Sequence, residues 1–146
     1  LTDRPAPPSA QRKVHSHSLG TSDMGWYGAP RWWSAAHRGF PASLQGVPLL
    51  LPTPHSVVRG QLDRWLQQHG LRPQVVAEIE DSALLETFGS TGLGIFPAAL
   101  AAESALRKRS QVRMIGACEG VQAHCYAIST ERRVMHPLVQ RILKRT

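Results

Sequence analysis

Cysteine is scarce in this sequence, since only Cys118 and Cys125 occur among its 146 residues. The pair has neither CxxC nor metal-finger spacing, which fits a reducing cytosol better than a disulfide-stapled secreted scaffold. The longest apolar runs, residues 47–51 and 95–102, fall well short of the roughly 18 residues that a membrane-spanning helix needs. No signal-peptide pattern is visible. We therefore expect a soluble cytoplasmic protein without a membrane partner; a disulfide between the two cysteines stays open.

Catalytic and metal-binding patterns are absent as well. No serine stands in a GxSxG elbow, no HExxH pair occurs, and the seven histidines are scattered. His124 and Cys125 point to opposite faces if they share a strand, so they form no dyad. The glycine cluster of residues 89–94 closes a predicted helix and enters a strand, the reverse of a phosphate-binding loop. We expect no catalytic residue, no metal site, no cofactor and no enzymatic activity.

Acidic residues are few, with 10 against 17 lysines and arginines, and the net charge is +7. The excess lies at the flanks, because residues 1–46 carry +3, residues 47–106 carry −3 and residues 107–146 carry +7. Arg107-Lys108-Arg109 and Lys144-Arg145 are interpreted as a helix end and a chain end, where cations favour the helix dipole. A phosphate-binding patch is the alternative, and it would need several such groups on one face.

Hydrophobic periodicity predicts short strands that alternate with helices. Residues 1–23, rich in Pro, Ser, His and Arg, are predicted to be irregular. Strands are predicted at residues 24–28, 47–51, 74–79, 93–96, 112–115 and 124–128. Helices are predicted from Pro30, at residues 56–69, from Asp81 or Ser82 to Gly89, at residues 97–106 with Pro97 in the first turn, and from His136-Pro137. This alternation predicts an α/β fold with a mixed sheet flanked by helices.

The clearest of these helices is residues 56–69. Its apolar side chains recur at helical spacing and share one face; they are Val58, Leu62, Trp65 and Leu66. Gly70 is a stop signal directly after it. Trp65 is the largest side chain on that face, so we predict that it anchors the helix in the core.

Two loops are predicted to face a ligand, because ligands of open α/β sheets bind beyond the carboxyl ends of strands. The first contains Thr53, His55 and Ser56, whose hydroxyl and imidazole groups precede a helix N-terminus. Capping of that helix by Thr53 or Ser56 is the alternative. The second loop, Glu80-Asp81-Ser82, places carboxylates at a helix start, where capping and the helix dipole explain them. Contact with a cation or another polar group is the alternative there.

The stretch of residues 46–97 resembles part of a known family. Its segments are Gly-Val-Pro-Leu-Leu-Leu-Pro-Thr from Gly46, Trp-Leu-Gln-Gln-His-Gly-Leu-Arg-Pro from Trp65, Val-Val-Ala-Glu-Ile-Glu-Asp-Ser-Ala-Leu-Leu from Val75, and Gly-Leu-Gly-Ile-Phe-Pro from Gly92. Together they resemble the second subdomain of the effector-binding domain of LysR-type transcription regulators. Three further stretches resemble segments of the first subdomain; they are residues 1–5, 127–129 and 136–139.

This resemblance implies a sensor of the type II periplasmic-binding-protein fold, of which the chain holds an incomplete two-subdomain copy. Residues 1–23 are then the end of the first subdomain and the crossover, and residues 24–128 form the second subdomain. Residues 129–146 form the return segment and the C-terminal helix of the first.

The resemblance also implies where an effector, either a small molecule or an ion, contacts the chain. Family members bind it between their subdomains, at loops such as that of Thr53, His55 and Ser56. Phe96 and Pro97 are expected to supply the apolar floor of the cleft. Polar or cation contacts are assigned to the second loop, which contains Glu80, Asp81 and Ser82.

Residues 3–7, 39–44 and 80–84 are similar to a family member that regulates sodium/proton antiport. The implied function is control of an antiporter gene in response to sodium, with His55 as a candidate pH sensor because imidazoles titrate near neutral pH. The implied assembly is a homo-oligomer that reaches promoter DNA through an N-terminal helix-turn-helix, which this sequence does not show. The alternative is a type II solute-binding protein of a transporter, because it shares the fold.

Overall fold

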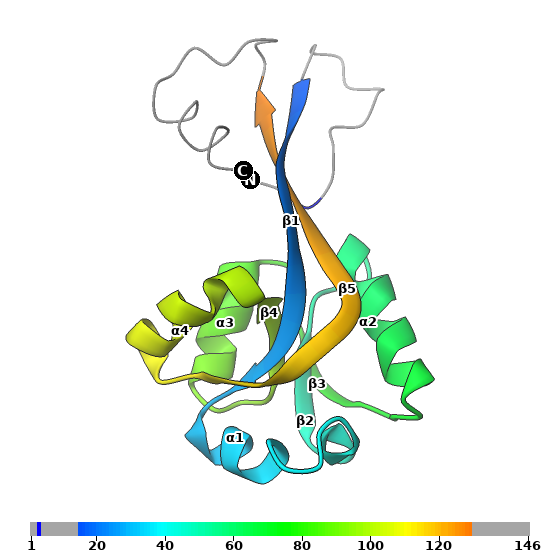
Figure 1. Cartoon of the computed structure of the whole chain (residues 1–146), viewed down its shortest axis with the longest axis vertical. Helices are drawn as coiled ribbons and strands as arrows, with labels where there is room; N and C mark the ends of the chain where they lie inside the picture. Colours follow the sequence, from blue (N-terminus) through cyan, green and yellow to red (C-terminus); the bar gives the residue numbers. More distant parts are fainter. Residues whose placement is uncertain (1–2, 4–14, 130–146) are drawn as a thin grey trace. The chain divides into compact units, whose positions relative to one another are not determined.

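Two long strands, β1 (His15–Gly28) and β5 (Arg113–Ser129), dominate the computed structural model (Figure 1). The structure describes residue 3 and residues 15–129. The chain divides into two compact units, one comprising Leu1–Thr21 and Ala123–Thr146 and the other comprising Ser22–Gln122. Both long strands therefore pass from one unit to the other. The helices and the remaining strands described below belong to the second unit.

The strands form two sheets, which together contain parallel and antiparallel pairs. β4 (Phe96–Ala99) pairs antiparallel with β1, so that Tyr27 lies opposite Phe96, and the strand order is β4-β1-β5. β2 (Pro48–Leu51) pairs in parallel with β3 (Gln74–Glu78). Ile95 joins the two sheets, because its N–H donates to the Pro48 carbonyl at 2.9 Å and its carbonyl accepts the Leu50 N–H at 2.8 Å. The prediction of an α/β fold with a mixed sheet is confirmed.

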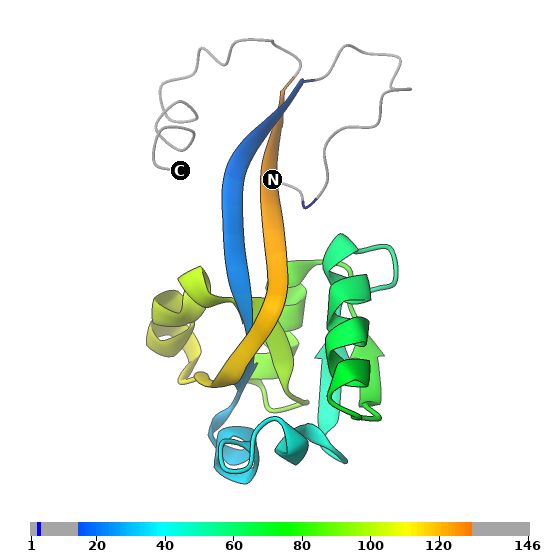
Figure 2. The same ribbon diagram turned by 45° about the vertical axis from the view of Figure 1, so that its right-hand side comes forward.

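The helices cover both faces of these strands. α2 (Val57–Gln68) lies on one side of β1 and β5, and α3 (Ser82–Ser90) and α4 (Glu103–Ser110) lie on the other (Figures 1 and 2). The short α1 (Pro30–Ala36) begins with a proline, which is tolerated in the first turn because that N–H has no intrahelical partner. Two 3₁₀ turns, Ala42–Leu44 and Leu100–Ala102, complete the described helical elements.

Adjacent residues of β1 serve two separate core regions, because successive side chains of a strand point to opposite faces. Tyr27 packs with Phe96 at a ring distance of 6.1 Å, within a buried cluster that also contains Leu50, Leu85, Ala98, Leu106 and Val112. Trp26 is fully buried and lies 5.9 Å from the Trp65 ring on α2. The predicted burial of Val58, Leu62, Trp65 and Leu66 is confirmed.

The prediction that residues 1–23 are irregular is wrong from His15 onward, because β1 begins there. Serine, histidine and threonine dominate this part of the strand, and its inward-facing apolar residues are few. Leu19 is buried, whereas Ser16 and Ser18 are exposed. Half-buried strands with so few apolar positions give a weak alternation signal.

Three further predictions need correction. The two strands predicted at residues 112–115 and 124–128 are replaced by the single strand β5, which begins at Arg113 and passes through Gly120 at a φ of +83°. Pro97 lies inside β4 and not in a helix, and the strand predicted at residues 93–96 is shifted to Phe96–Ala99. The predicted helix at residues 97–106 is replaced by a 3₁₀ turn followed by α4, which starts at Glu103.

Some expectations lie outside the described residues. These are the helix from His136-Pro137, the return segment after residue 129 and most of the crossover within residues 1–23. The proposed division into subdomains at residues 23 and 128 stays a prediction. Within residues 15–129, no helix has the length and apolarity needed to cross a membrane.

Candidate functional site

The two loops singled out in the sequence follow neighbouring parallel strands. Leu51 at the end of β2 lies opposite Glu78 at the end of β3, and the Ile79 N–H donates to the Leu51 carbonyl at 3.0 Å. The loop of residues 53–56 and the loop of residues 80–82 therefore leave the same edge of the sheet. This is the edge at which open α/β sheets bind ligands.

Arg59 on the first turns of α2 ties this edge together. Its guanidinium donates to the Pro52 carbonyl at 2.8 Å, to Glu78 at 2.6 Å and to Asp63 at 2.9 Å. Burial lowers the pKa of Arg59, but the hydrogen bonds and charges of the two carboxylates outweigh it and raise that pKa above its usual value. Arg59 thus stays charged and holds the backbone directly before Thr53. Sequence reasoning missed this residue, although its i,i+4 spacing from Asp63 is a visible signal.

Thr53 places an unsatisfied hydroxyl in this loop. Its Oγ1 atom is buried and has no hydrogen-bond partner among the described residues, while its carbonyl accepts the Ser56 N–H at 3.0 Å. Ser56 is the N-cap residue of α2, but its side chain makes no capping hydrogen bond. The alternative interpretation, in which Thr53 or Ser56 caps α2, is therefore wrong. A buried hydroxyl without a partner is unfavourable unless another group satisfies it.

His55 and the second loop are more exposed. His55 lies at the surface between Thr53 and Ser56. Asp81 is the N-cap of α3, where its carboxylate accepts the Leu84 N–H at 2.9 Å, so the capping interpretation is confirmed. Glu80 and Ser82 are exposed. In the described part of the chain, no group of three or more His, Cys, Asp or Glu side chains is arranged to hold a metal ion.

Phe96 and Pro97 lie deeper than a loop position. Phe96 is fully buried, stacks on Tyr27 and contacts Gly89, and Pro97 lies opposite Trp26 in the sheet. Core packing already accounts for the Phe96 ring. Its role as an apolar floor beneath an effector stays a prediction, as do the effector contacts of Thr53, His55 and Ser56.

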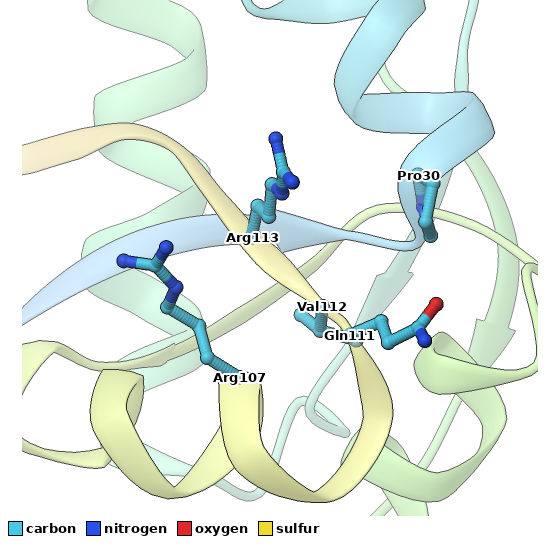
Figure 3. A pocket seen from close by; sticks show the side chains of 5 residues that line it. All are labelled: Pro30, Arg107, Gln111, Val112 and Arg113. Atoms are coloured by element: carbon cyan, nitrogen blue, oxygen red, sulfur yellow. The ribbon is translucent and has the colours of Figure 1, made fainter.

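A shallow pocket of about 390 Å³ lies elsewhere, at the carboxyl end of α4 (Figure 3). It is lined by Pro30, Arg107, Gln111, Val112 and Arg113. Arg107 belongs to the basic last turn of α4, and the Arg113 guanidinium lies 5.1 Å above the Trp33 ring. Figure 3 shows the two guanidinium groups directed apart, and not toward one point. Since cations at a helix C-terminus complement its dipole, this pocket supports the helix-end interpretation of the basic run.

Two buried titratable groups have pKa values that keep them neutral. Burial raises the pKa of the Cys118 thiol to about 12, with the Trp26 side chain opposing part of the rise. Burial, and secondarily the charge of Glu103, raises the pKa of Tyr27 to about 12. A thiol nucleophile needs a lowered pKa and access to solvent. Cys118 therefore lacks the properties of an activated nucleophile.

Comparison with known proteins identifies a family whose model matches nearly the whole chain. Residues 4–145 match the family model described as the LysR substrate binding domain. The transcriptional activator protein NhaR of Escherichia coli K12 is 35% identical to this chain over 103 residues, which make up 70% of the chain and 34% of NhaR. The chain thus spans about a third of the length of this relative.

Solved structures support the same fold. The effector domain of AmpR from Pseudomonas aeruginosa aligns with a TM-score of 0.66 at 17% identity, over 93% of this chain and 66% of that domain. The regulatory domain of CcmR from Synechocystis PCC6803, solved in complex with 2-PG, aligns with a TM-score of 0.60 at 11% identity, over 97% of this chain and 69% of that chain. The expected type II periplasmic-binding-protein-like fold is confirmed.

Proposed function

The chain belongs to the LysR substrate-binding domain family, and from this premise we propose that residues 53–56 form one wall of the effector site of a bacterial transcription regulator. The observation that carries the proposal is the buried Thr53 hydroxyl, which has no partner among the described residues. A polar atom of the effector supplies that partner. His55 and Ser56 contact the same ligand from the exposed side of the loop.

The position of the loop supports a polar or anionic group on the effector. It precedes the N-terminus of α2, a helix of 12 residues. Its N-cap residue, Ser56, makes no side-chain capping hydrogen bond, and the helix dipole favours negative charge at this end. A small molecule with oxygen acceptors has the required chemistry. Phe96 and Pro97 then lie beneath the ligand as its apolar support.

The similarity to NhaR supports a finer proposal, in which the regulator activates a sodium/proton antiporter gene in the cytoplasm. Sodium is then the trigger, and Glu80 supplies a carboxylate oxygen, the ligand type that hard cations prefer. Asp81 is the weaker candidate, since one of its oxygens already caps α3. DNA binding and oligomerisation reside in the full-length regulator, which acts as a homo-oligomer and not as an enzyme.

Hydroxyl deletion tests the loop assignment. Reporter induction is measured in a full-length regulator that carries this chain, across sodium concentration and pH, for Thr53→Ala, Ser56→Ala and Glu80→Gln. Loss of one ligand hydrogen bond shifts the half-maximal effector concentration by about tenfold. Thr53→Ser keeps the hydroxyl and is expected to respond like the parent, and Thr87→Ala deletes an exposed hydroxyl on α3 as a control. Unchanged dose responses for Thr53→Ala and Ser56→Ala, at unchanged protein levels, contradict the assignment.

A further inference from the structure

Three hydrogen bonds of side-chain amides connect α2 to β5 and β5 to β1. The Gln61 Nε2 donates to the Gln122 carbonyl at 3.0 Å, and the Gln122 N–H donates to the Gln61 Oε1 at 3.0 Å. The Gln122 Nε2 in turn donates to the Asp23 Oδ1 at 3.0 Å. The Gln61 amide thus pairs with the backbone of β5 as a neighbouring strand does. We call Gln61, Gln122 and Asp23 the amide clamp.

The amide clamp lies at the border of the Ser22–Gln122 unit. Gln122 is the last residue of that unit and Asp23 is its second, so the clamp holds β5 and β1 where each strand leaves the unit. Gly120, two residues before Gln122, has a φ of +83°, and Gly20 in β1 has a φ of +119°. Positive φ favours glycine, and few residues with such freedom absorb changes of chain direction.

The same helix carries the effector loop at its N-terminus. Gln61 follows Ser56 by five residues, about 7.5 Å along a helix axis. α2 is held as a rigid body by its buried face, which includes Leu62 and Trp65. A movement of its N-terminus therefore reaches Gln61 with little loss, because interiors are close-packed.

We propose that the amide clamp transmits the state of the residue 53–56 loop to β1 and β5. This inference rests on the proposed function, since it takes residues 53–56 as the effector loop. Gln61 is a positioning residue in this mechanism. It contacts no effector, and its amide, which is only partly buried, pairs at a site where water competes for the bonds.

Amide hydrogen exchange tests the clamp in this chain. Gln61→Ala removes the acceptor of the Gln122 N–H, so the exchange of that amide is expected to rise by about tenfold, with smaller rises at its neighbours in β5. Gln61→Glu keeps the acceptor and loses the donor, so protection of the Gln122 N–H is expected to persist. Gln68→Ala, an exposed glutamine of the same helix, is the matched control. Unchanged exchange in Gln61→Ala overturns the proposal.

Reporter output separates transmission from a merely structural tether. In a full-length regulator carrying this chain, with sodium chloride as the probe and potassium chloride at equal ionic strength as the reference, Gln61→Ala is expected to lower the ratio of induced to basal output by about fivefold. Sodium-dependent changes in exchange at residues 53–57 are expected to persist. If the ratio of induced to basal output is unchanged while the Gln122 N–H exchanges faster, the clamp only holds the strands in place, and the proposal is overturned.

Failure of the proposed function gives a different result. If Thr53→Ala leaves the ratio unchanged and Gln61→Ala lowers it, the effector-loop assignment fails and the clamp stands as a restraint on the strands. If sodium chloride induces no reporter expression in the parent, the basal reporter outputs of the parent and the variants are compared instead. A basal shift of threefold or more, about 0.65 kcal/mol, in Gln61→Ala but not in Gln68→Ala supports the clamp, and equal basal outputs overturn it.

Discussion

Gly60 and Gly89 both lie inside helices, but their surroundings differ. A Cβ atom added at Gly89 would overlap the Phe96 ring, with 2.7 Å to its Cγ atom, whereas one added at Gly60 would meet nothing within 4 Å. Gly89→Ala is therefore expected to lower the free energy of unfolding by about 1–3 kcal/mol through overpacking. Gly60→Ala is expected to raise it by about 0.5–1 kcal/mol through helix propensity. Urea unfolding of both variants measures these changes. If both substitutions change the free energy of unfolding in the same direction, the packing assigned to Gly89 is contradicted.

Trp65 joins three aromatic side chains from different segments. Its ring lies 5.9 Å from Trp26, 5.8 Å from Phe40 and 4.2 Å from His69, and the side chain is 4% exposed. Trp65→Ala is expected to lower the free energy of unfolding by about 3–5 kcal/mol. Leu84→Ala, at a position 51% exposed, is the control and is expected to change it little. A Trp65→Ala protein that unfolds like the parent shows that this ring is not an anchor.

Tyr27 and Cys118 predict a loss of stability at high pH. Both pKa values are raised to about 12 in the folded chain, from 10.0 and 9.0. Below those lower values both groups are protonated in both states and have no effect. As the pH rises toward about 12, the unfolded chain releases its protons first, so the free energy of unfolding falls.

Substitution separates the two contributions. Tyr27→Phe is expected to flatten the decline above about pH 10, and Cys118→Ala to flatten it from about pH 9, as measured by urea midpoints across the alkaline range. If the urea midpoints of Tyr27→Phe and the parent fall with pH in the same way, the Tyr27 hydroxyl ionises in the folded chain as easily as in water.

The roles of individual polar residues were only partly predictable. The sequence placed Thr53, Ser56 and Asp81 next to helix starts, and each position suited either a cap or a ligand contact. Capping depends on where one oxygen points, because the hydrogen bond needs a distance near 2.9 Å and a suitable angle. The structure assigns the cap to Asp81 and leaves the Thr53 hydroxyl without a partner among the described residues.

At the scale of elements, α3 depends on its N-cap. Asp81→Ala removes the acceptor of the Leu84 N–H and is expected to lower the free energy of unfolding by about 1 kcal/mol. Asp81→Asn keeps a capping oxygen and is expected to lose less. Glu80→Ala removes the adjacent exposed carboxylate, which makes no cap, and serves as the control. Thermal unfolding that affects Glu80→Ala and Asp81→Ala equally means that charge near α3 matters and the cap does not.

Elements with strong local patterns were predictable and long strands were not. β2 and α2 were located from a continuous apolar run and from helical spacing, signals carried within a dozen residues. β5 contains Gly116 and Gly120, which broke its pattern into two apparent strands. Pro97 was misassigned because a proline suits a first helical turn, yet strands also accept proline where its nitrogen is not needed as a donor.

For the whole molecule, charge sets the expected interaction with DNA. The middle of the sequence is acidic, and the basic run at Arg107-Lys108-Arg109 complements the end of α4. This 146-residue chain alone is therefore expected to bind promoter DNA weakly and without sequence preference, and the binding is expected to vanish as salt rises. Titration of labelled promoter DNA against scrambled DNA at two salt concentrations measures this. Sequence-specific nanomolar binding at physiological salt is the contradicting result.

The family and the fold class were predictable because their motifs are contiguous in residues 46–97. Contacts between distant residues were not, since no local pattern marks them. Gln61 and Gln122 are 61 residues apart, and each is a polar residue of ordinary appearance in its own segment. Only the folded chain places them within hydrogen-bond distance of each other.

The place of β1 in the sheet also determines when that sheet is able to form. β1 lies between β4 and β5, and Met24 pairs with Ala99, so the first described strand waits for partners that are synthesised much later. Closing such long loops costs entropy before any contact compensates for it, which slows folding. During translation, β2, α2 and β3 emerge together and have one another as partners, while β1 stays unpaired until the ribosome has released residues 96–99 and then residues 113–129. A nascent chain halted before residue 96 is therefore a chain with its longest emerged strand still open to other partners.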